Sequence, residues 1–391
     1  MSTFELEEIN KLTLEKHHLT EESKIDDIIK ITNDICGLHS TNLTTSYLSL
    51  FARTINFSKS DLERELYLKK TLGRVRGMRR TLFIQTAEMI PIMHAATFKI
   101  IETSFEKYME FHKVTTNEFQ ELSKKILEII NGRELSATEI RNELNTDANI
   151  PAIIQLMNNY GLLIRSRPIK DWKDRRNKYT AFKNYFPDVD LNRYNEKEAI
   201  KLLVEMYIKA FGPVSESDIS WWTGLTKKKI RSALNKIKSQ FKNIVISNIK
   251  GNFLISDSDL KHFNQIMRFE KPNLILLPEL DPYLMGYKDR ERYIKPDNYT
   301  HVFDRSGNIT STILLNGIVI GVWDKEEKPK PVIKFYLFQP VKNALEKVLF
   351  SKAKELGAFY YDREVEILEC SSMIPLTERN AGGFMSPLKN C

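Results

Sequence analysis

The chain has 391 residues, more than one hydrophobic core usually serves, so roughly two to four domains are expected. Its 42% hydrophobic and 28% charged residues are typical of a globular protein, and the lack of an apolar run of about 18 residues argues against a membrane-spanning helix or a membrane partner. The formal net charge of +8 favours a polyanionic partner, although a lysine-rich surface alone would give the same charge.

A polar stretch near the N-terminus, Gly37-Leu38-His39-Ser40-Thr41-Asn42, lies between two apolar helical segments, 28–35 and 47–53. As a local pattern it predicts the end of one helix and a new N-cap at one of its last three residues. The alternative is a reactive site that faces a groove, and only the rest of the chain can favour it.

A basic hairpin follows in residues 72–84, which contain a glycine-bearing turn and four arginines. These are Arg74, Arg76, Arg79 and Arg80. Helices followed by a basic hairpin are the plan of a winged helix-turn-helix, so residues 1–114 are predicted to form the first such motif. Its last part, 87–114, is predicted to be one largely apolar helix.

Residues 115–195 repeat this plan with helices over 118–131, 135–144 and 152–160 and a second hairpin. The hairpin is predicted to have a long basic tip that contains an aromatic residue. The tip and its flanking strands carry Arg165, Arg167, Lys170, Trp172, Lys173, Arg175, Arg176 and Lys178.

Residues 196–268 are predicted to repeat it a third time. A helix over 197–211 ends at Gly212-Pro213, two helices follow over 214–224 and 226–234, and strands are expected at 244–246 and 252–255. The second of these helices opens with Lys227, Lys228, Lys229 and Arg231.

Residues 269–391 change character and predict a β-rich domain with one helix over 342–356. Strands are expected over 274–277, 310–315, 317–323, 331–338 and 364–368. Asn316-Gly317 is a strong hairpin signal. The predicted fold class is therefore α+β, with tandem winged helix-turn-helix motifs followed by a small C-terminal β-barrel-like domain.

The basic residues gather on two predicted wings and at the start of one helix, which are surfaces through which winged helices contact the DNA backbone. Charged loops are common, so an ordinary solvated surface remains the alternative for any one cluster. Three such clusters favour double-stranded DNA as the partner.

The three cysteines, Cys36, Cys370 and Cys391, are far apart and form no Cys-x-x-Cys pair, so a thiolate metal site is not expected. Scattered thiols also argue against a disulfide framework and are typical of the reducing cytoplasm. The acidic N-terminus does not resemble a signal peptide. A cytoplasmic protein is therefore expected.

Five segments, in order along the chain, resemble segments of the AlkZ/YcaQ winged-helix DNA glycosylases. They are residues 37–42, 79–84, 211–225, 277–290 and 317–323. The resemblance implies a C-shaped cradle for duplex DNA and excision of alkylated bases, with unhooking of interstrand cross-links in some members. It also implies a monofunctional enzyme without metal or other cofactor.

The resemblance places the family's catalytic pair at His39 and Thr41. The family usually has Gln-x-Gln or Gln-x-Asp there, and Thr41 offers neither an amide nor a carboxylate. The residues themselves suggest how a site without a strong acid would work, because an alkylated purine is already cationic and leaves as a neutral base. His39 would orient a water molecule, and Thr41 or Asn42 would hold it by hydrogen bonds.

The first hypothesis is therefore a monomeric DNA glycosylase that acts on alkylated bases, including bulky adducts or cross-links. The alternative is a winged-helix DNA-binding protein without catalysis, a regulator or a lesion sensor. A weaker third reading is RNA binding, with Trp172 stacking on unpaired bases. Asp281 and Asp289 are expected to have structural roles rather than to serve the site.

Overall fold

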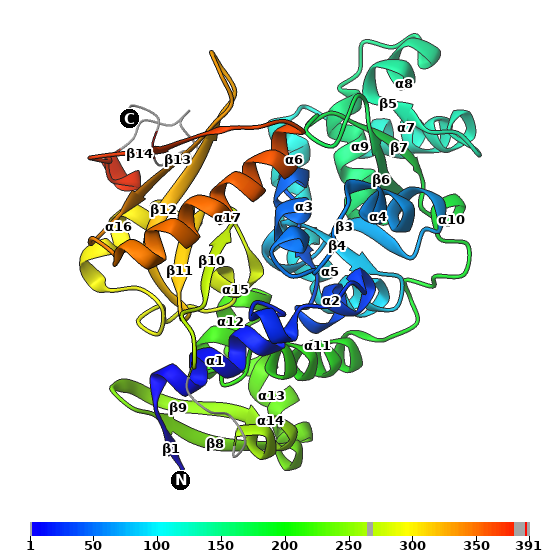
Figure 1. Ribbon diagram of the computed structural model, residues 1–391. Helices are drawn as coiled ribbons and strands as arrows, with labels where there is room; N and C mark the ends of the chain where they lie inside the picture. The colour runs from blue at the N-terminus through cyan, green and yellow to red at the C-terminus, as the bar shows by residue number, and fades with distance from the viewer. Residues whose placement is uncertain (1, 264–268, 379–387, 389–391) are drawn as a thin grey trace.

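The computed structural model describes residues 2–263, 269–378 and 388, and it combines helices with three open β-sheets (Figure 1). The predicted α+β class is confirmed. The longest sheet consists, in spatial order, of β2 (Leu38–His39), β4 (Leu82–Thr86), β3 (Leu72–Arg76), β6 (Leu163–Pro168), β7 (Asn177–Ala181) and β5 (Leu135–Ser136). The second consists of β10 (Leu274–Leu277), β11 (Thr312–Leu315), β12 (Ile318–Glu326), β13 (Val332–Leu337) and β14 (Glu366–Glu369). The third consists of β1 (Thr3–Phe4), β8 (Phe241–Ile246) and β9 (Ile249–Ser256).

The helices surround these sheets. Those of the first half are α1 (Leu6–Lys16), α2 (Ile28–Asp34), α3 (Leu43–Phe51), α4 (Lys59–Glu63), α5 (Met89–Glu102), α6 (Phe105–Phe111), α7 (Thr116–Ile129), α8 (Ala137–Leu144), α9 (Ile150–Asn159) and α10 (Phe182–Tyr185). Those of the second half are α11 (Glu196–Phe211), α12 (Glu216–Thr223), α13 (Lys227–Ile237), α14 (Asp257–Phe263), α15 (Pro282–Met285), α16 (Tyr299–Val302) and α17 (Asn343–Tyr361). Short turns of 3-10 or π type are η1 (Glu21–Ser23), η2 (Arg64–Leu68), η3 (Met78–Arg80), η4 (Lys238–Gln240), η5 (Pro296–Asn298) and η6 (Leu376–Glu378).

Each predicted helix–helix–hairpin order is present. The hairpins β3–β4, β6–β7 and β8–β9 are antiparallel, and α8 with α9 precedes the second while α12 with α13 precedes the third. The first two hairpins are not separate, because β3 pairs with β6 at Arg74 and Arg165. One sheet therefore crosses the domain boundary predicted at residue 114.

The single helix predicted over 87–114 is wrong, because the chain forms α5 and α6 with a break at Thr103 and Ser104. The hydroxyl of Thr103 donates to the carbonyl of Ile100, and that of Ser104 donates to the carbonyl of Ile101, at 2.9 and 2.6 Å. Hydroxyls that bond to the preceding turn compete with the backbone N–H groups that would continue the helix.

The C-terminal sheet is open rather than barrel-like, so that prediction is wrong. Strands β10 and β14 lie at its two edges, and β14 pairs parallel to β13. A parallel pair needs a crossover connection, and α17 supplies it (Figure 1). Because α17 packs on β10, β13 and β14, it covers the sheet that a barrel would have to close. The Asn316-Gly317 turn is confirmed, with positive φ angles of 51° and 82°.

The N-terminal residues belong to the third sheet. Thr3 and Phe4 form a strand parallel to β8. Residues far apart in the sequence therefore complete one sheet beside α1 (Figure 1).

A fully buried ion pair connects the residues just after α3 to the segment after β10. Arg53 donates from Nη1 and Nη2 to the two carboxylate oxygens of Asp281, each at 2.8 Å, and neither side chain is exposed. Through this pair the helix that follows residues 37–42 is tied to the C-terminal part of the chain.

The helices and the cysteines can be compared with the expectations from composition. No helix within the described ranges is long and apolar enough to cross a membrane. Cys36 is buried and free, whereas Cys370 is disulfide-bonded, so the argument against disulfides does not hold for Cys370.

Candidate active site and nucleic-acid interface

The 37–42 segment runs from the end of α2 through the edge strand β2 to the start of α3. Asp27 caps α2 by accepting hydrogen bonds from the N–H groups of its first turn. The chain then reverses at Cys36 and Gly37, whose φ angles are 55° and 99°. A Cβ atom on Gly37 would lie 3.0 Å from the carbonyl oxygen of Ile84, so both the angle and the close approach of β4 favour glycine.

His39 pairs with Phe83 of β4 and is only 3% exposed. Its ring contacts that of Phe83 edge-on, with centroids 5.2 Å apart, and its Nδ1 is buried without a hydrogen-bond partner among the described residues. Burial lowers the pKa of His39 to about 3; the charge of Arg79 acts in the same direction, and Glu279 opposes it. The imidazole is therefore neutral at physiological pH.

Arg74 holds the backbone of Ser40 and Thr41, the two residues that follow His39. Its Nε and Nη2 donate to the carbonyl of Ser40 at 2.9 and 2.6 Å, and Nη2 also reaches the carbonyl of Thr41 at 3.3 Å. Its Nη1 donates to Oδ1 of Asn177 at 2.8 Å. The side chain is buried and fully engaged, so it is not available to a phosphate in this conformation, contrary to the expectation for a wing residue.

Thr41 is exposed, and Asn42 occupies the N-cap position of α3 without capping it. The local prediction of an N-cap in this segment is thus met by backbone position only. The side chain of Asn42 turns away from the helix, and its Nδ2 donates to Oε1 of Glu279 at 3.1 Å.

Glu279 was missed by the sequence reasoning. It follows β10 and lies 237 residues from Asn42 in the chain. The hydroxyl of Ser311 donates to its Oε2 at 3.3 Å, and the ammonium of Lys325 lies 3.7 Å from the same oxygen. Burial raises the pKa of Glu279, but the charge of Lys325 and the hydrogen bonds from its own N–H, Asn42 and Ser311 outweigh burial, so the pKa lies below its usual value. The only available signal was its place in the family-like segment 277–290.

The predicted DNA contacts differ in exposure. Exposed side chains are Arg80, Arg167, Lys170, Arg175, Arg176, Lys227, Lys228 and Arg231. Partly buried ones are Arg76, Arg79, Arg165, Lys173, Lys178 and Lys229. Of the exposed group, Arg167, Arg176 and Arg231 lie in ion pairs with Glu134, Asp174 and Glu216. Lys170, Arg175, Lys227 and Lys228 form no ion pair within the described part of the chain.

Trp172 is buried rather than presented on the tip of a wing. Its ring packs on Tyr47 of α3 at 4.8 Å and on Tyr360 of α17 at 5.2 Å, and it is 7% exposed. The tip of the second hairpin is therefore docked between two helices. Base stacking by Trp172, and the RNA reading that depended on it, lose their support.

The tip of the first hairpin is also docked. Arg79 has a positive φ of 50° and lies over the ring of Trp221 in α12, with its guanidinium 4.5 Å from the ring centroid. Arg290 approaches the same ring at 5.3 Å. Arg80 donates to the carbonyl of Ile100 at 3.2 Å and remains exposed. Arg79 thus connects the turn between β3 and β4 to α12, while Arg80 faces solvent.

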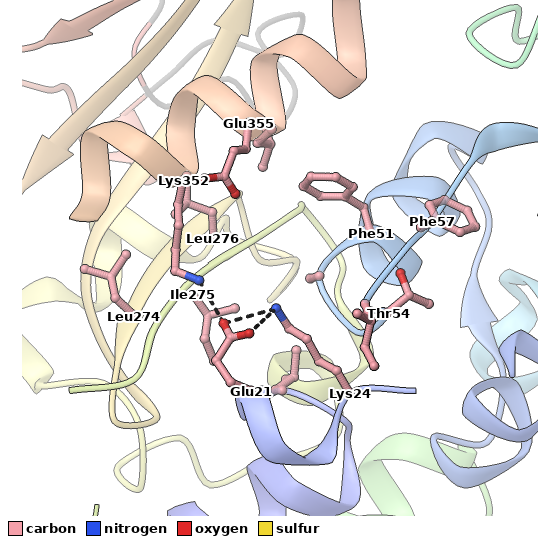
Figure 2. A pocket seen from close by; sticks show the side chains of 14 residues that line it. Glu21, Lys24, Phe51, Thr54, Phe57, Leu274, Ile275, Leu276, Lys352 and Glu355 are labelled. Carbon is pink, nitrogen blue, oxygen red and sulfur yellow. Dashed lines mark hydrogen bonds and ion pairs between the residues drawn. The ribbon is translucent and has the colours of Figure 1, made fainter. Parts of the chain in front are cut away.

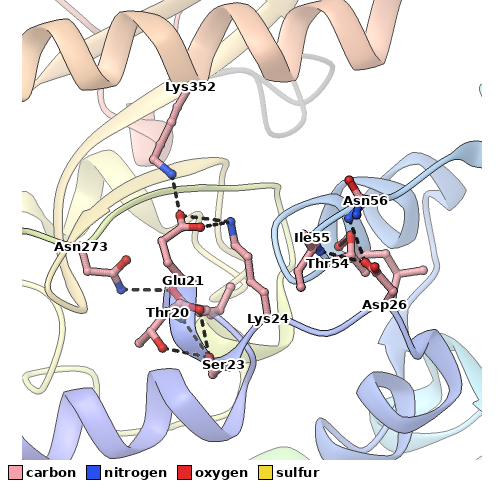
Figure 3. Close-up of polar contacts among 12 residues, drawn as sticks. Thr20, Glu21, Ser23, Lys24, Asp26, Thr54, Ile55, Asn56, Asn273 and Lys352 are labelled. Carbon is pink, nitrogen blue, oxygen red and sulfur yellow. Dashed lines mark hydrogen bonds and ion pairs between the residues drawn. The ribbon is translucent and has the colours of Figure 1, made fainter.

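A cavity of about 340 Å³ lies beside Phe51 (Figure 2). Phe51 is the last residue of α3, whereas Asn42 precedes the first residue of that helix. It is lined by Phe51, by β10 and by residues of α17. Its charges neutralise one another, because Glu21 accepts from Lys24 and from Lys352 at distances of 3.0–3.1 Å (Figure 3). This cavity has no side chain in common with the His39 region. Nowhere in the described ranges do three or more His, Cys, Asp or Glu side chains gather as metal ligands.

A family model for AlkZ-like DNA glycosylases matches residues 32–359 of the chain. The class of protein is therefore a DNA glycosylase, with DNA as its substrate, and the chain belongs to the AlkZ-like DNA glycosylase family. The predicted family is confirmed.

A solved structure with a similar fold is the DNA glycosylase AlkZ of Streptomyces sahachiroi. It superposes with a TM-score of 0.77 at 15% sequence identity, over 95% of this chain and 100% of that one. Among curated proteins, no sequence match was found. The 15% identity makes this likeness one of fold alone.

Proposed function

We propose that this protein is a monofunctional glycosylase that hydrolyses the N-glycosidic bond of alkylated bases in duplex DNA, including bulky adducts or cross-linked bases. The observation that carries the proposal is a neutral, buried His39 followed, three residues later, by the partly exposed Asn42, both in the family-like segment 37–42. Family membership supports the reaction class, and the residues at this segment support the choice of substrate.

The chemistry suits a cationic leaving base. Water adds to C1′ of the deoxyribose, the electron pair of the C1′–N bond leaves with the base, and a proton is released to solvent. Because an N3- or N7-alkylated purine carries a positive charge, it departs neutral and needs no strong acid from the protein. Neutral His39, with Thr41 or Asn42, is suited to orienting the water.

Duplex DNA would be held by three winged-helix motifs acting in one monomer. The second uses α8, α9 and the hairpin β6–β7, and the third uses α12, α13 and the hairpin β8–β9. The strongest candidates for phosphate contacts are exposed cations that form no ion pair with any described residue, Lys170 and Arg175 in one motif and Lys227 and Lys228 in the other.

The test is an abasic-site assay with excess enzyme on duplexes that carry one N3- or N7-alkylated purine or a bulky N7 adduct. Wild-type enzyme should produce abasic sites in a single turnover. His39→Ala should slow that step by about a hundredfold while changing DNA affinity by about threefold or less. An absence of abasic sites on every duplex would rule out the activity for these lesions.

One observation favours a second candidate, a lesion-binding protein without catalysis. Thr41 stands where the family usually has glutamine or aspartate. This candidate predicts tight binding that prefers alkylated duplex over intact duplex, with no base released. Comparing binding and base release in the same samples separates the two functions.

A further inference from the structure

We propose that Glu279 is a positioning residue of the active site, which fixes the amide of Asn42 so that Asn42, rather than Thr41, holds the attacking water. The inference rests on the proposed glycosylase function and adds a residue from the C-terminal part of the chain. It also explains how a site with threonine at its second position would work.

The orientation of Asn42 follows from the chemistry of its partner. An amide has a donor end and an acceptor end, whereas an ionised carboxylate only accepts. The contact of 3.1 Å with Oε1 of Glu279 must therefore involve Nδ2. The acceptor, Oδ1, then points away from the carboxylate and makes no hydrogen bond with any residue that the structure describes. It is free to accept a hydrogen bond from water.

Glu279 is itself held from the C-terminal sheet. Its N–H donates to Oγ of Ser311 at 3.1 Å, the same hydroxyl donates to Oε2, and Lys325 of β12 lies 3.7 Å away. Glu279 is 8% exposed, and these contacts fix the direction of its carboxylate before any substrate arrives. Such preorganisation is what an active site requires of a group that orients another.

Stability alone does not account for this arrangement. Replacing a buried ion pair such as Glu279 and Lys325 by apolar side chains is often neutral or stabilising. The pair is nevertheless present beside residues 37–42, and its carboxylate is bonded to the one side chain there that has both an amide and access to solvent. A fixed negative charge near C1′ would also favour the positive charge that develops on the sugar.

The experiment exchanges the two groups. Glu279→Gln removes the charge, Asn42→Asp places two carboxylates 3.1 Å apart, and the double variant Asn42→Asp/Glu279→Gln restores one amide and one carboxylate with their places exchanged. Glu21→Gln is the matched control, because that glutamate is also bonded to lysines (Figure 3). Glu21 lines the cavity beside Phe51, at the other end of α3 from Asn42. Single-turnover rate, DNA affinity and unfolding midpoint are measured for each, on the lesion that the wild type cleaves fastest.

Glu279→Gln should lower the single-turnover rate by about tenfold or more, with DNA affinity within about twofold of wild type. Asn42→Asp should be slow at neutral pH and recover as the pH falls, because protonating one carboxyl relieves the repulsion. The double variant should exceed Asn42→Asp at pH 7 by about fivefold or more. The control should match wild type.

An unchanged rate for Glu279→Gln would overturn the inference while leaving the glycosylase function intact. If that variant fails to fold, the double variant decides, and a rate no better than Asn42→Asp alone would overturn it as well. A wild-type protein that releases no base from any duplex would remove the proposed function, and this inference with it.

Discussion

The buried pair of Arg53 and Asp281 permits a quantitative test of how the two ends of the chain are joined. Besides the two bonds from Arg53, Asp281 accepts from the hydroxyl of Ser49 at 2.7 Å and from the N–H of Tyr283 at 3.0 Å. Every oxygen of this carboxylate is therefore used within the protein. We expect Asp281→Asn to lower the free energy of unfolding by about 3–5 kcal/mol, the cost of leaving one partner of a buried pair uncompensated.

The magnitude follows from what asparagine keeps and loses. Its carbonyl oxygen, in the place of Oδ1, can still accept from Tyr283 and from Nη2 of Arg53, but its NH₂ group cannot accept from Nη1 of Arg53 or from Ser49. The guanidinium then stays fully buried without its counter-charge, and its Nε already lacks a partner among the described residues. The double variant Arg53→Met/Asp281→Leu removes both charges and should recover most of the loss.

Urea unfolding followed by circular dichroism measures the difference. The control is Glu216→Gln, which breaks the solvent-exposed pair with Arg231 and should leave the midpoint nearly unchanged. If Asp281→Asn unfolds at the same urea concentration as Glu216→Gln, the buried pair does not stabilise the contact between these elements.

Three further predictions concern the site. The pKa of His39 is about 3 in the folded protein and near 6.5 in the unfolded chain, so the unfolded state binds more protons between these pH values. The free energy of unfolding should therefore decrease as the pH drops below about 6.5. His39→Ala should weaken this decrease, measured by urea titrations at pH 7 and 5. Arg74→Lys should slow single-turnover cleavage by about tenfold or more and leave DNA affinity nearly unchanged, whereas a phosphate-binding role would weaken affinity instead. Lys227→Ala/Lys228→Ala should make the slope of log K against log salt shallower by about 1.8, measured by fluorescence anisotropy, and Arg231→Ala should change it less because Glu216 already pairs with that arginine.

Local periodicity predicted the elements well. The strand expected over 274–277 is β10, the helix over 197–211 is α11, and the Asn316-Gly317 turn has the expected angles. These features depend on the alternation of apolar residues, on caps and on glycine, all of which act over a few residues. The closure of the C-terminal sheet was predicted wrongly, because strand order depends on where α17 crosses it.

The exposure of individual side chains, and their contacts with residues far away in the sequence, could not be predicted from local sequence patterns. Trp172 lies in a basic loop, and only the docking of that loop against Tyr47 and Tyr360 buries it. Arg74 sits in a strand with other arginines but turns inward to the carbonyl of Ser40. No spacing in the sequence could bring Glu279 to Asn42, since their contact depends on packing between distant parts of the chain.

Asn42 is central to both interpretations of residues 37–42, as a helix cap and as a reactive site. An asparagine at an N-cap normally stabilises its helix by about 1 kcal/mol through its side-chain oxygen, and Asn42 forgoes this contribution. Its amide is bonded to a buried carboxylate instead, and its oxygen is left without a partner in the described structure. A residue that gives up a local cap to bond a buried carboxylate from a distant part of the chain is a candidate for a functional role. We therefore expect Asn42, one position beyond Thr41, to be the second functional residue of the segment, after His39.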